Sequence, residues 1–347
     1  MLVYWVAFLF PVSFCFFRSR LSIQEEKLFV GLIWVFFFLL IGLRFEVGGD
    51  WDSYLRHLSY NHDRDFLGVL TSGDPGYYLI NYFVAKAGGG IAWVNSVCAA
   101  IIMTGVVRFS RSQPLPWLAI VVSVPYLIIV VAMGYTRQSA ALGFLLLGLV
   151  SLSNKNSLWF VFWVVLGSTF HKSAVLMLPM AALASTQRRL WNFFWIGVAS
   201  FIFAYIFVFD SAGDLWSNYV EADYESQGGL VRVLMNVVPA VLFLCFKRKL
   251  AVSEAERRLW TWMSLAALLC LPLVVISSTA TDRVALYLIP LQLYVFARLH
   301  LIFSDSYARA VTVISVIFYY ALVQFVWLLF AANADDWLPY QMYPFAS

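Results

Sequence analysis

The sequence predicts an all-α fold, a polytopic helix bundle embedded in a membrane and forming one domain over residues 1–347. Hydrophobic residues fill 62% of the 347 positions and charged residues only 12%, too few to cover the surface of a soluble protein. Long apolar runs recur along the chain, and most approach the roughly 20 residues that a helix needs to cross about 30 Å of hydrocarbon. These runs are Leu2–Phe17, Leu28–Leu43, Ile91–Val107, Trp117–Met133, Ala140–Leu152, Trp191–Val208, Val231–Phe246, Leu259–Ile276, Val284–Ala297 and Val311–Phe330.

Two of the apolar segments need separate treatment. Basic residues follow Leu2–Phe17, at Arg18 and Arg20, so we expect a retained first helix instead of a cleaved signal. Pro75–Ala87 is too short to span, and we expect a re-entrant or interfacial helix that lines protein or water. With these assignments the expected number of crossings is about twelve, within a range of about ten to fourteen.

The cysteines and the net charge exclude other classes of protein. The four cysteines each stand alone in an apolar run, a spacing that fits neither a zinc site nor a disulfide framework. The net charge of +4 would suit a nucleic-acid partner in a soluble chain. In this chain it follows from the excess of Lys and Arg in cytoplasmic loops, and we expect no nucleic acid.

The distribution of Lys and Arg predicts the orientation of the helices. Placing 15 of the 23 in the cytoplasm leaves eight outside, puts both termini outside, and leaves two substantial outer loops, at residues 44–76 and 210–229. For the crossings to alternate, Leu158–Leu183 has to be a hairpin of two half-length helices with His171-Lys172 at its outward tip. The alternative, one helix of 26 residues, would place Lys247–Lys249 outside and the acidic stretch Asp210–Glu225 inside.

The eight basic residues left outside include several at the ends of apolar runs. Cations that converge on the outer mouth of a helix bundle suit an anionic, membrane-tethered substrate such as a lipid-linked diphosphate, because the planar arginine fork binds phosphate. Arg137 stands out because apolar runs flank it and no acidic residue is close in sequence. For any one arginine the alternative is snorkelling or a structural ion pair, and Arg283 could pair with Asp282. The eight are Arg44, Arg56, Arg64, Lys86, Arg137, Lys172, Arg232 and Arg283.

Carboxylates cluster in the first outer loop, in Gly48–Tyr54 (GGDWDSY) and Asp74–Tyr77 (DPGY). Glycine pairs beside aspartate and aromatic residues suit a tight turn that presents oxygens and a stacking surface to sugar hydroxyls. The alternative is helix capping, for Asp50 and above all for Asp74, which precedes a proline. Asp50 and Asp52 have no third ligand at a suitable spacing, so we expect no metal.

The sequence Phe170-His171-Lys172-Ser173 interrupts an otherwise apolar segment. An imidazole at the outer membrane surface could accept a proton from an attacking hydroxyl, and Lys172 beside it would favour the neutral form that a base needs. The alternative is a histidine that bonds a backbone carbonyl at a helix break. The remaining histidines, which we expect to be solvated, are His57, His62 and His300.

These motifs, in this order, resemble the EpsG family of exopolysaccharide polymerases, which are Wzy-like and related to O-antigen and capsule polymerases. The resemblance spans nearly the full chain, is strongest between Arg44 and Ala174, and thins after Asp210. Arg232 and Arg283 are the counterparts of later family arginines. The residues that carry it are Gly42-Leu43-Arg44, Gly49–Tyr54, Asp74–Tyr77, Arg137-Gln138, Phe170–Ala174 and Trp337-Leu338-Pro339-Tyr340.

The resemblance implies a membrane glycosyltransferase that uses no cofactor, neither a metal nor a nucleotide sugar, and direct attack on the anomeric carbon would make it inverting. Such enzymes transfer a growing glycan from undecaprenyl diphosphate onto a new lipid-linked repeat unit, at the outer face of the bacterial inner membrane. The implied partners are these two lipid-linked oligosaccharides, membrane lipid and a separate chain-length regulator, and GT-C-like character is an open alternative for the fold.

Joined to the charge map, the resemblance gives each candidate residue a role. Arg44, Arg137 and Arg283 would hold the donor diphosphate, and His171, or failing that Asp50, would deprotonate the acceptor. Trp51, Tyr54 and Tyr77 would stack on sugars. The expected substrate-binding set is completed by Asp52, Asp74, Gln138, Lys172 and Arg232.

Functions other than polymerisation also fit these sequence features. A flippase for lipid-linked oligosaccharides would also need an arginine-lined path, although no mirrored repeat is evident in the sequence. An O-antigen ligase or an O-acetyltransferase would keep the outer active site and change the acceptor.

Overall fold

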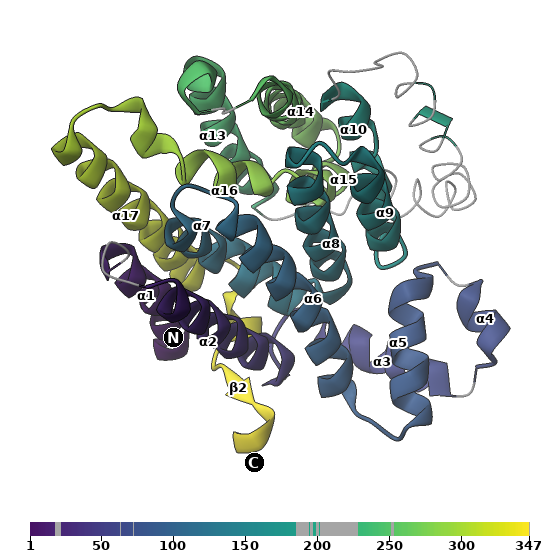
Figure 1. Ribbon diagram of the computed structural model, residues 1–347. Helices are drawn as coiled ribbons and strands as arrows, with labels where there is room; N and C mark the ends of the chain where they lie inside the picture. Colours follow the sequence, from purple (N-terminus) through teal and green to yellow (C-terminus); the bar gives the residue numbers. More distant parts are fainter. Residues whose placement is uncertain are drawn as a thin grey trace. The chain divides into compact units, whose positions relative to one another are not determined.

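The computed structural model describes residues 1–17, 22–62, 64–71, 73–184, 194, 197–198, 201, 228–250 and 253–346 (Figure 1). These residues are almost entirely helical, which confirms the predicted all-α class. They form two compact units. Unit 1 comprises Met1–Leu147, Thr169–His171 and Ile314–Ser347, and unit 2 comprises Gly148–Ser168 and Lys172–Val313. The assignment of one domain to the whole chain stays a prediction.

Unit 1 contains both ends of the chain. Its first part holds α1 (Leu2–Phe17), α2 (Ile23–Gly42), β1 (Arg44–Phe45), α3 (Trp51–His62), α4 (Phe66–Leu70), α5 (Pro75–Lys86), α6 (Ile91–Arg111) and α7 (Pro116–Ser123). A π-helix (Val124–Ala132) and most of α8 (Thr136–Ser153) follow. The C-terminal part adds most of α17 (Ser306–Phe330), 3₁₀ turns at Ala334–Trp337 and Tyr343–Phe345, and β2 (Gln341–Met342).

Small residues bring the helices of unit 1 close together. A Cβ atom on Gly42, the last residue of α2, would lie 2.8 Å from Oγ of Ser96 on α6. A Cβ on Gly105 of α6 would overlap the backbone of Gly143 on α8. Glycine at such crossings lets two backbones approach, as is common in membrane helices. As a result the end of α2 and the body of α8 both pack against α6.

One pair of strands occurs in the described part of the chain. β1 and β2 run antiparallel, with Arg44 opposite Met342 and Phe45 opposite Gln341. The C-terminal segment therefore lies directly beside the residues that follow α2.

Unit 2 is built around α13 (Gly229–Leu250) and α14 (Glu254–Ile276), which pack against each other. α15 (Ser278–Leu286) and α16 (Pro290–Phe296) pack on both, and α10 (Pro179–Ala184) packs on α14. Its other elements are α9 (Ser157–Ser168) and the 3₁₀ helices Lys172–Met177 and Leu299–Ile302.

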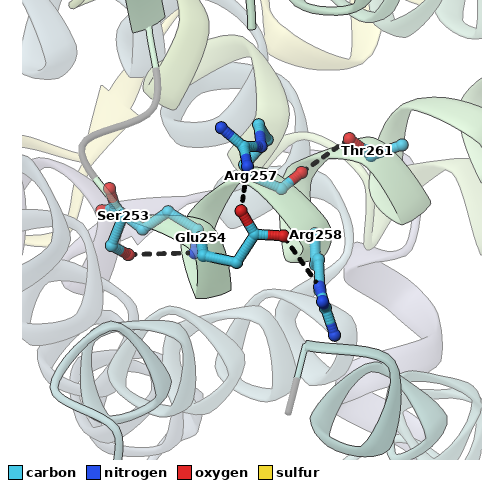
Figure 2. A network of polar contacts seen from close by, with 6 residues as sticks. Ser253, Glu254, Arg257, Arg258 and Thr261 are labelled. Atoms are coloured by element: carbon cyan, nitrogen blue, oxygen red, sulfur yellow. Dashed lines mark hydrogen bonds and ion pairs between the residues drawn. The ribbon is translucent and has the colours of Figure 1, made fainter. Parts of the chain in front are cut away.

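Local chemistry fixes where α14 begins. The Ser253 hydroxyl accepts a hydrogen bond from the backbone N–H of Glu256 at 3.2 Å, as an N-cap does. Glu254 in the first turn pairs with Arg257 and Arg258 (Figure 2). These pairs are solvent-exposed, so each contributes at most about 1 kcal/mol.

Four of the described helices, α6, α13, α14 and α17, are long and apolar enough to cross a membrane. The expected count of about twelve crossings is not confirmed. Val284–Ala297, which we expected to be one helix, is divided between α15 and α16 by a turn before Pro290, a residue that favours a first helical position. The run Trp191–Val208 and the loop 210–229 lie almost wholly outside the described residues.

The segment Leu158–Leu183 is broken in the middle, so the alternative of one long helix is wrong. α9 ends at Ser168 and a 3₁₀ helix begins at Lys172, followed by α10. α9 packs against both following helices, as the predicted hairpin requires. That its tip faces outward stays a prediction. The expected short helix at Pro75–Ala87 is present as α5.

Candidate functional site

Arg44 is completely buried, and its guanidinium is hydrogen bonded on nearly all sides by neutral protein atoms. It donates to the carbonyls of Ile41 (2.7 Å) and Val47 (3.2 Å), to Oδ1 of Asn95 (3.2 Å) and to Oγ1 of Thr136 (2.7 Å). These bonds occupy four of the five N–H donors that an arginine offers. Arg44 therefore ties the end of α2, helix α6 and the start of α8 together.

Arg137 is the next residue after Thr136, but its side chain is differently placed. Its Nη1 donates to Oδ2 of Asp74 at 2.9 Å, and its Cζ lies 5.9 Å from the centre of the Tyr77 ring. The side chain is 29% exposed. Among the described residues no protein acceptor lies on its Nε or Nη2. Arg137 is thus held in place by one carboxylate and keeps donors for a ligand.

Asp74 starts α5 in the way the sequence predicts, with Pro75 at the first helical position. The side-chain cap that the alternative interpretation requires is absent from the described structure, and the Asp74 side chain pairs with Arg137. This pair joins the start of α5 to the start of α8. The start of α5 therefore fixes the direction of the Arg137 fork.

The face of α3 toward this pair is aromatic and polar. Tyr54 is buried, its hydroxyl donates to Oδ2 of Asp50 at 3.4 Å, and its ring lies 5.9 Å from that of Tyr77, which is also buried. Trp51 packs against Phe45 (5.9 Å between ring centres), so its ring serves the packing around β1. Of the other residues expected to bind substrate, Asp52 is exposed and Gln138 is buried.

His171 is near this cluster through its neighbours in the chain. The backbone N–H of Gly76 donates to the carbonyl of Thr169 at 2.8 Å. A Cβ on Gly76 would overlap Oγ1 of Thr169 and lie 2.9 Å from the ring of Phe170, so only glycine permits this approach. The DPGY motif and the break that carries half-buried His171 are therefore packed together in unit 1.

The comparison with known families matches these motifs as a set. The family model described as the EpsG family matches residues 27–342, nearly the whole chain. The chain belongs to the EpsG family. Membership confirms the resemblance and fits a membrane protein of exopolysaccharide biosynthesis with a polysaccharide polymerase-type function. No curated protein and no solved structure matches the chain.

The sequence prediction missed one residue at this cluster. His57, expected to be solvated, is half-buried on α3, with its ring 6.3 Å from that of Tyr77 and its Nδ1 3.3 Å from the Tyr78 hydroxyl. Burial, followed by the positive charges of Arg137 and Arg56, lowers the pKa of His57 to about 4. Asp50, Tyr54 and His57 are spaced i, i+4, i+7, the helical signal that could have revealed it.

The other cations predicted to bind substrate, Lys172, Arg232 and Arg283, lie in unit 2. Nε of Arg232 donates to Oδ1 of Asp282 at 2.7 Å, with the two side chains 16% and 13% exposed. Asp282 thus pairs with Arg232, a partner 50 positions earlier in the sequence. Lys172 begins the 3₁₀ helix, and its neighbour Ser173 donates to the Tyr287 hydroxyl at 3.2 Å. That the cations of both units converge on one ligand stays a prediction.

Proposed function

We propose that this EpsG-family protein is a polysaccharide polymerase that moves a growing glycan from undecaprenyl diphosphate onto a new lipid-linked repeat unit. The reaction takes place at the outer face of the bacterial inner membrane. Donor and acceptor are both lipid-bound, and the enzyme is inverting and independent of metal and nucleotide sugar. Family membership supports the polymerase class, and the residues of unit 1 support the chemistry.

The reaction joins one oxygen to the anomeric carbon and releases another. The acceptor hydroxyl oxygen attacks the anomeric carbon, the bond from that carbon to the diphosphate oxygen breaks, and its electron pair stays on the diphosphate. The hydroxyl proton passes to a base. Two demands follow, a cation for the departing diphosphate and a proton acceptor for the hydroxyl.

Arg137 is the observation that carries the proposal. Its guanidinium is oriented by Asp74 and has Nε and Nη2 donors without a protein acceptor among the described residues. A fork held in this way can stabilise charge that develops on a diphosphate without first reorganising. Arg44 donates to Thr136, the residue before Arg137, and because four of its donors are occupied by protein atoms we propose that it holds the start of α8.

Two groups are proposed for the proton. His171 lies two residues after Thr169, which bonds Gly76 of the DPGY motif. Asp50 accepts a hydrogen bond from Tyr54, which contacts Tyr77 next to Arg137. Lys172, Arg232 and Arg283 are proposed as further contacts to the lipid-linked substrates.

The test is polymer formation by the purified protein in lipid nanodiscs supplied with undecaprenyl diphosphate-linked repeat units. His171→Ala and Asp50→Asn are compared, and the base is the residue whose replacement abolishes polymer at unchanged thermal stability. Near-normal polymer from His171→Ala removes His171 as the base, and unchanged turnover from Arg137→Ala removes the diphosphate contact.

The products also separate the proposal from the other classes. A ladder of glycan lengths on the lipid carrier is the expected result. Transfer of glycan to a lipid A core would instead indicate a ligase, transfer of acetyl groups an acetyltransferase, and translocation without new bonds a flippase.

A further inference from the structure

The end of the chain runs along the residues that carry the candidate site. Residues 334–343, termed here the C-terminal clasp, include β2, which pairs with β1 at Arg44. The Tyr343 N–H donates to the carbonyl of Leu43 at 2.9 Å, and the Tyr340 hydroxyl donates to the carbonyl of Leu40 at 2.7 Å. One side of the clasp therefore fixes the backbone on both sides of Arg44.

The other side of the clasp meets the turn that precedes Arg137. Trp337 is 3% exposed, and its Nε1 donates to the carbonyl of Ile129 in the π-helix at 2.9 Å. A Cβ on Gly134 would lie 2.5 Å from Cζ2 of Trp337. Because the indole is buried and hydrogen bonded, it has little freedom to move away. Only glycine at position 134 leaves room for it, three residues before Arg137.

Two further glycines, Gly48 and Gly49, lie where the loop before Asp50 contacts the clasp. Gly48 has a φ of +105°, its N–H donates to the carbonyl of Asp336 at 2.8 Å, and a Cβ there would overlap the carbonyl of Met133. A Cβ on Gly49 would lie 2.9 Å from Oδ2 of Asp336. The loop before Asp50, the turn before Arg137 and the clasp thus approach more closely than side chains allow.

We propose that the C-terminal clasp belongs to the candidate site, with Trp337 as a positioning residue that sets Arg137 relative to the loop carrying Asp50. This inference rests on the proposed polymerase function. The clasp touches no substrate in this role. It holds two loops from distant parts of the sequence at a fixed separation, and a displacement of about 1 Å in such a site costs on the order of 100-fold in rate.

The first test compares Trp337→Phe and Gly134→Ala in the polymerase assay, with Trp93→Phe and Gly31→Ala as matched controls. Trp93 is exposed, and a Cβ on Gly31 meets nothing within 4 Å. Both site variants should lower kcat about 10- to 100-fold, with a smaller effect on KM, because the geometry of the reacting groups changes. A clasp that only stabilises the fold would leave kcat and KM per folded molecule unchanged, which would overturn the proposal.

A double variant tests the contact itself. Phenylalanine lacks the Cζ2 atom that an alanine methyl at position 134 would meet, so Gly134→Ala/Trp337→Phe should be no slower than the worse single variant. If the double variant lost turnover by the product of the two single-variant factors, the two positions would act independently, and the proposed role of the clasp would be wrong. Arg137→Ala in the same assay separates the two levels of inference. If Arg137→Ala is inactive while Trp337→Phe and Gly134→Ala equal the wild type, only the clasp fails.

A crosslink covers the case in which the Trp337 and Gly134 variants do not fold. Phe45 and Gln341 are paired across β1 and β2, so cysteines at both positions, in a chain whose four native cysteines are replaced, should form a disulfide. The oxidised protein should keep the activity of its reduced form, because the bond only secures the existing arrangement. Loss of activity on oxidation, restored by reduction, would mean that the clasp has to open, and fixed positioning would be wrong.

Discussion

Arg44 and Arg137 are joined through Thr136, yet their guanidiniums are in opposite situations. Arg44 is completely buried and donates to four neutral acceptors, whereas Arg137 is partly exposed and donates to one carboxylate. The sequence marks both in the same way, as arginines at outward ends of apolar runs. An arginine that breaks the positive-inside pattern is therefore unusual, but the pattern does not tell what the arginine does. The number of its N–H donors that protein atoms occupy distinguishes a structural role from a binding role.

A second comparison sharpens the first. Arg137 with Asp74 in unit 1 and Arg232 with Asp282 in unit 2 are both close ion pairs, at 2.9 and 2.7 Å. Arg232 is the more buried of the two arginines, at 16% exposure against 29%. An ion pair alone therefore does not single out the site. The proposal for Arg137 rests on its further contact with Tyr77, whose ring centre lies 5.9 Å from Cζ of Arg137 and which Tyr54 and His57 also contact.

The largest effect is expected from Arg137→Met, which removes the charge that we propose stabilises the departing diphosphate most directly. Turnover should fall by about 10² to 10³, the loss typical of one transition-state donor. The temperature of thermal unfolding should fall less than for Arg44→Met, because Arg137 makes one hydrogen bond among the described residues, to Asp74, whereas Arg44 makes four. Arg137→Lys should recover only part of the rate, since an ammonium cannot form a two-pronged contact. Initial rates in nanodiscs check this, and a rate near wild type for Arg137→Met would contradict it.

The same substitution at the other arginine should act mainly on stability. Arg44→Met leaves the carbonyls of Ile41 and Val47 and the side chains of Asn95 and Thr136 without their donor, and each buried group left unsatisfied costs about 1 to 3 kcal/mol. Arg44→Met should therefore lower the unfolding temperature well below that of Arg137→Met. Thermal scans of the two purified variants measure the difference. Equal unfolding temperatures of the two variants would show that Arg44 does not hold α2, α6 and α8 together.

The sequence predicts candidate site residues but not the contacts between them. Arg137 stood out because it has no acidic residue nearby in sequence, but its partner Asp74 is distant along the chain and joins it only in the fold. Gly48 and Gly49 predicted a turn correctly, while the reason for both glycines is the approach of Met133 and Asp336. Such contacts depend on tertiary packing and leave no local pattern.

Trp51 and His57 show the same limit in opposite directions. The expected stacking of Trp51 on sugars stays a prediction, and the sequence did not reveal that its ring contacts Phe45 of β1 and Tyr343 of the C-terminal segment. His57 was expected to be solvated, and the packing of α5 on α3 buries half of it. Helical spacing predicts which residues share a face of α3, but not which neighbour covers that face.

A smaller loss is expected from Asp74→Asn, which keeps the shape of the side chain and removes its charge. The amide still accepts a hydrogen bond from Nη1 of Arg137, so the fork stays near its position with weaker orientation. We expect turnover to fall about tenfold, equal to about 1.4 kcal/mol, near the lower end of what a hydrogen bond to a charged group contributes. Asp65→Asn, at an exposed N-cap on α4, is the control. A loss as large as that of Arg137→Met would give Asp74 a direct part in the chemistry.

The smallest effect, and the finest test of the two arginines, is the pH dependence contributed by His57. The folded protein holds the pKa of His57 at about 4, against about 6.5 when unfolded. As the pH falls from about 6.5 to about 4, the unfolded chain takes up a proton that the folded protein refuses, so the free energy of unfolding decreases in this window. His57→Gln should remove that decrease from thermal scans between pH 4 and pH 8. Arg137→Met should shrink it, because Arg137 contributes to the low pKa of His57, whereas Arg44 is not among its causes and Arg44→Met should leave it intact. If Arg44→Met also shrinks the decrease, the charge of Arg44 reaches the cluster and the contrast between the two arginines is lost.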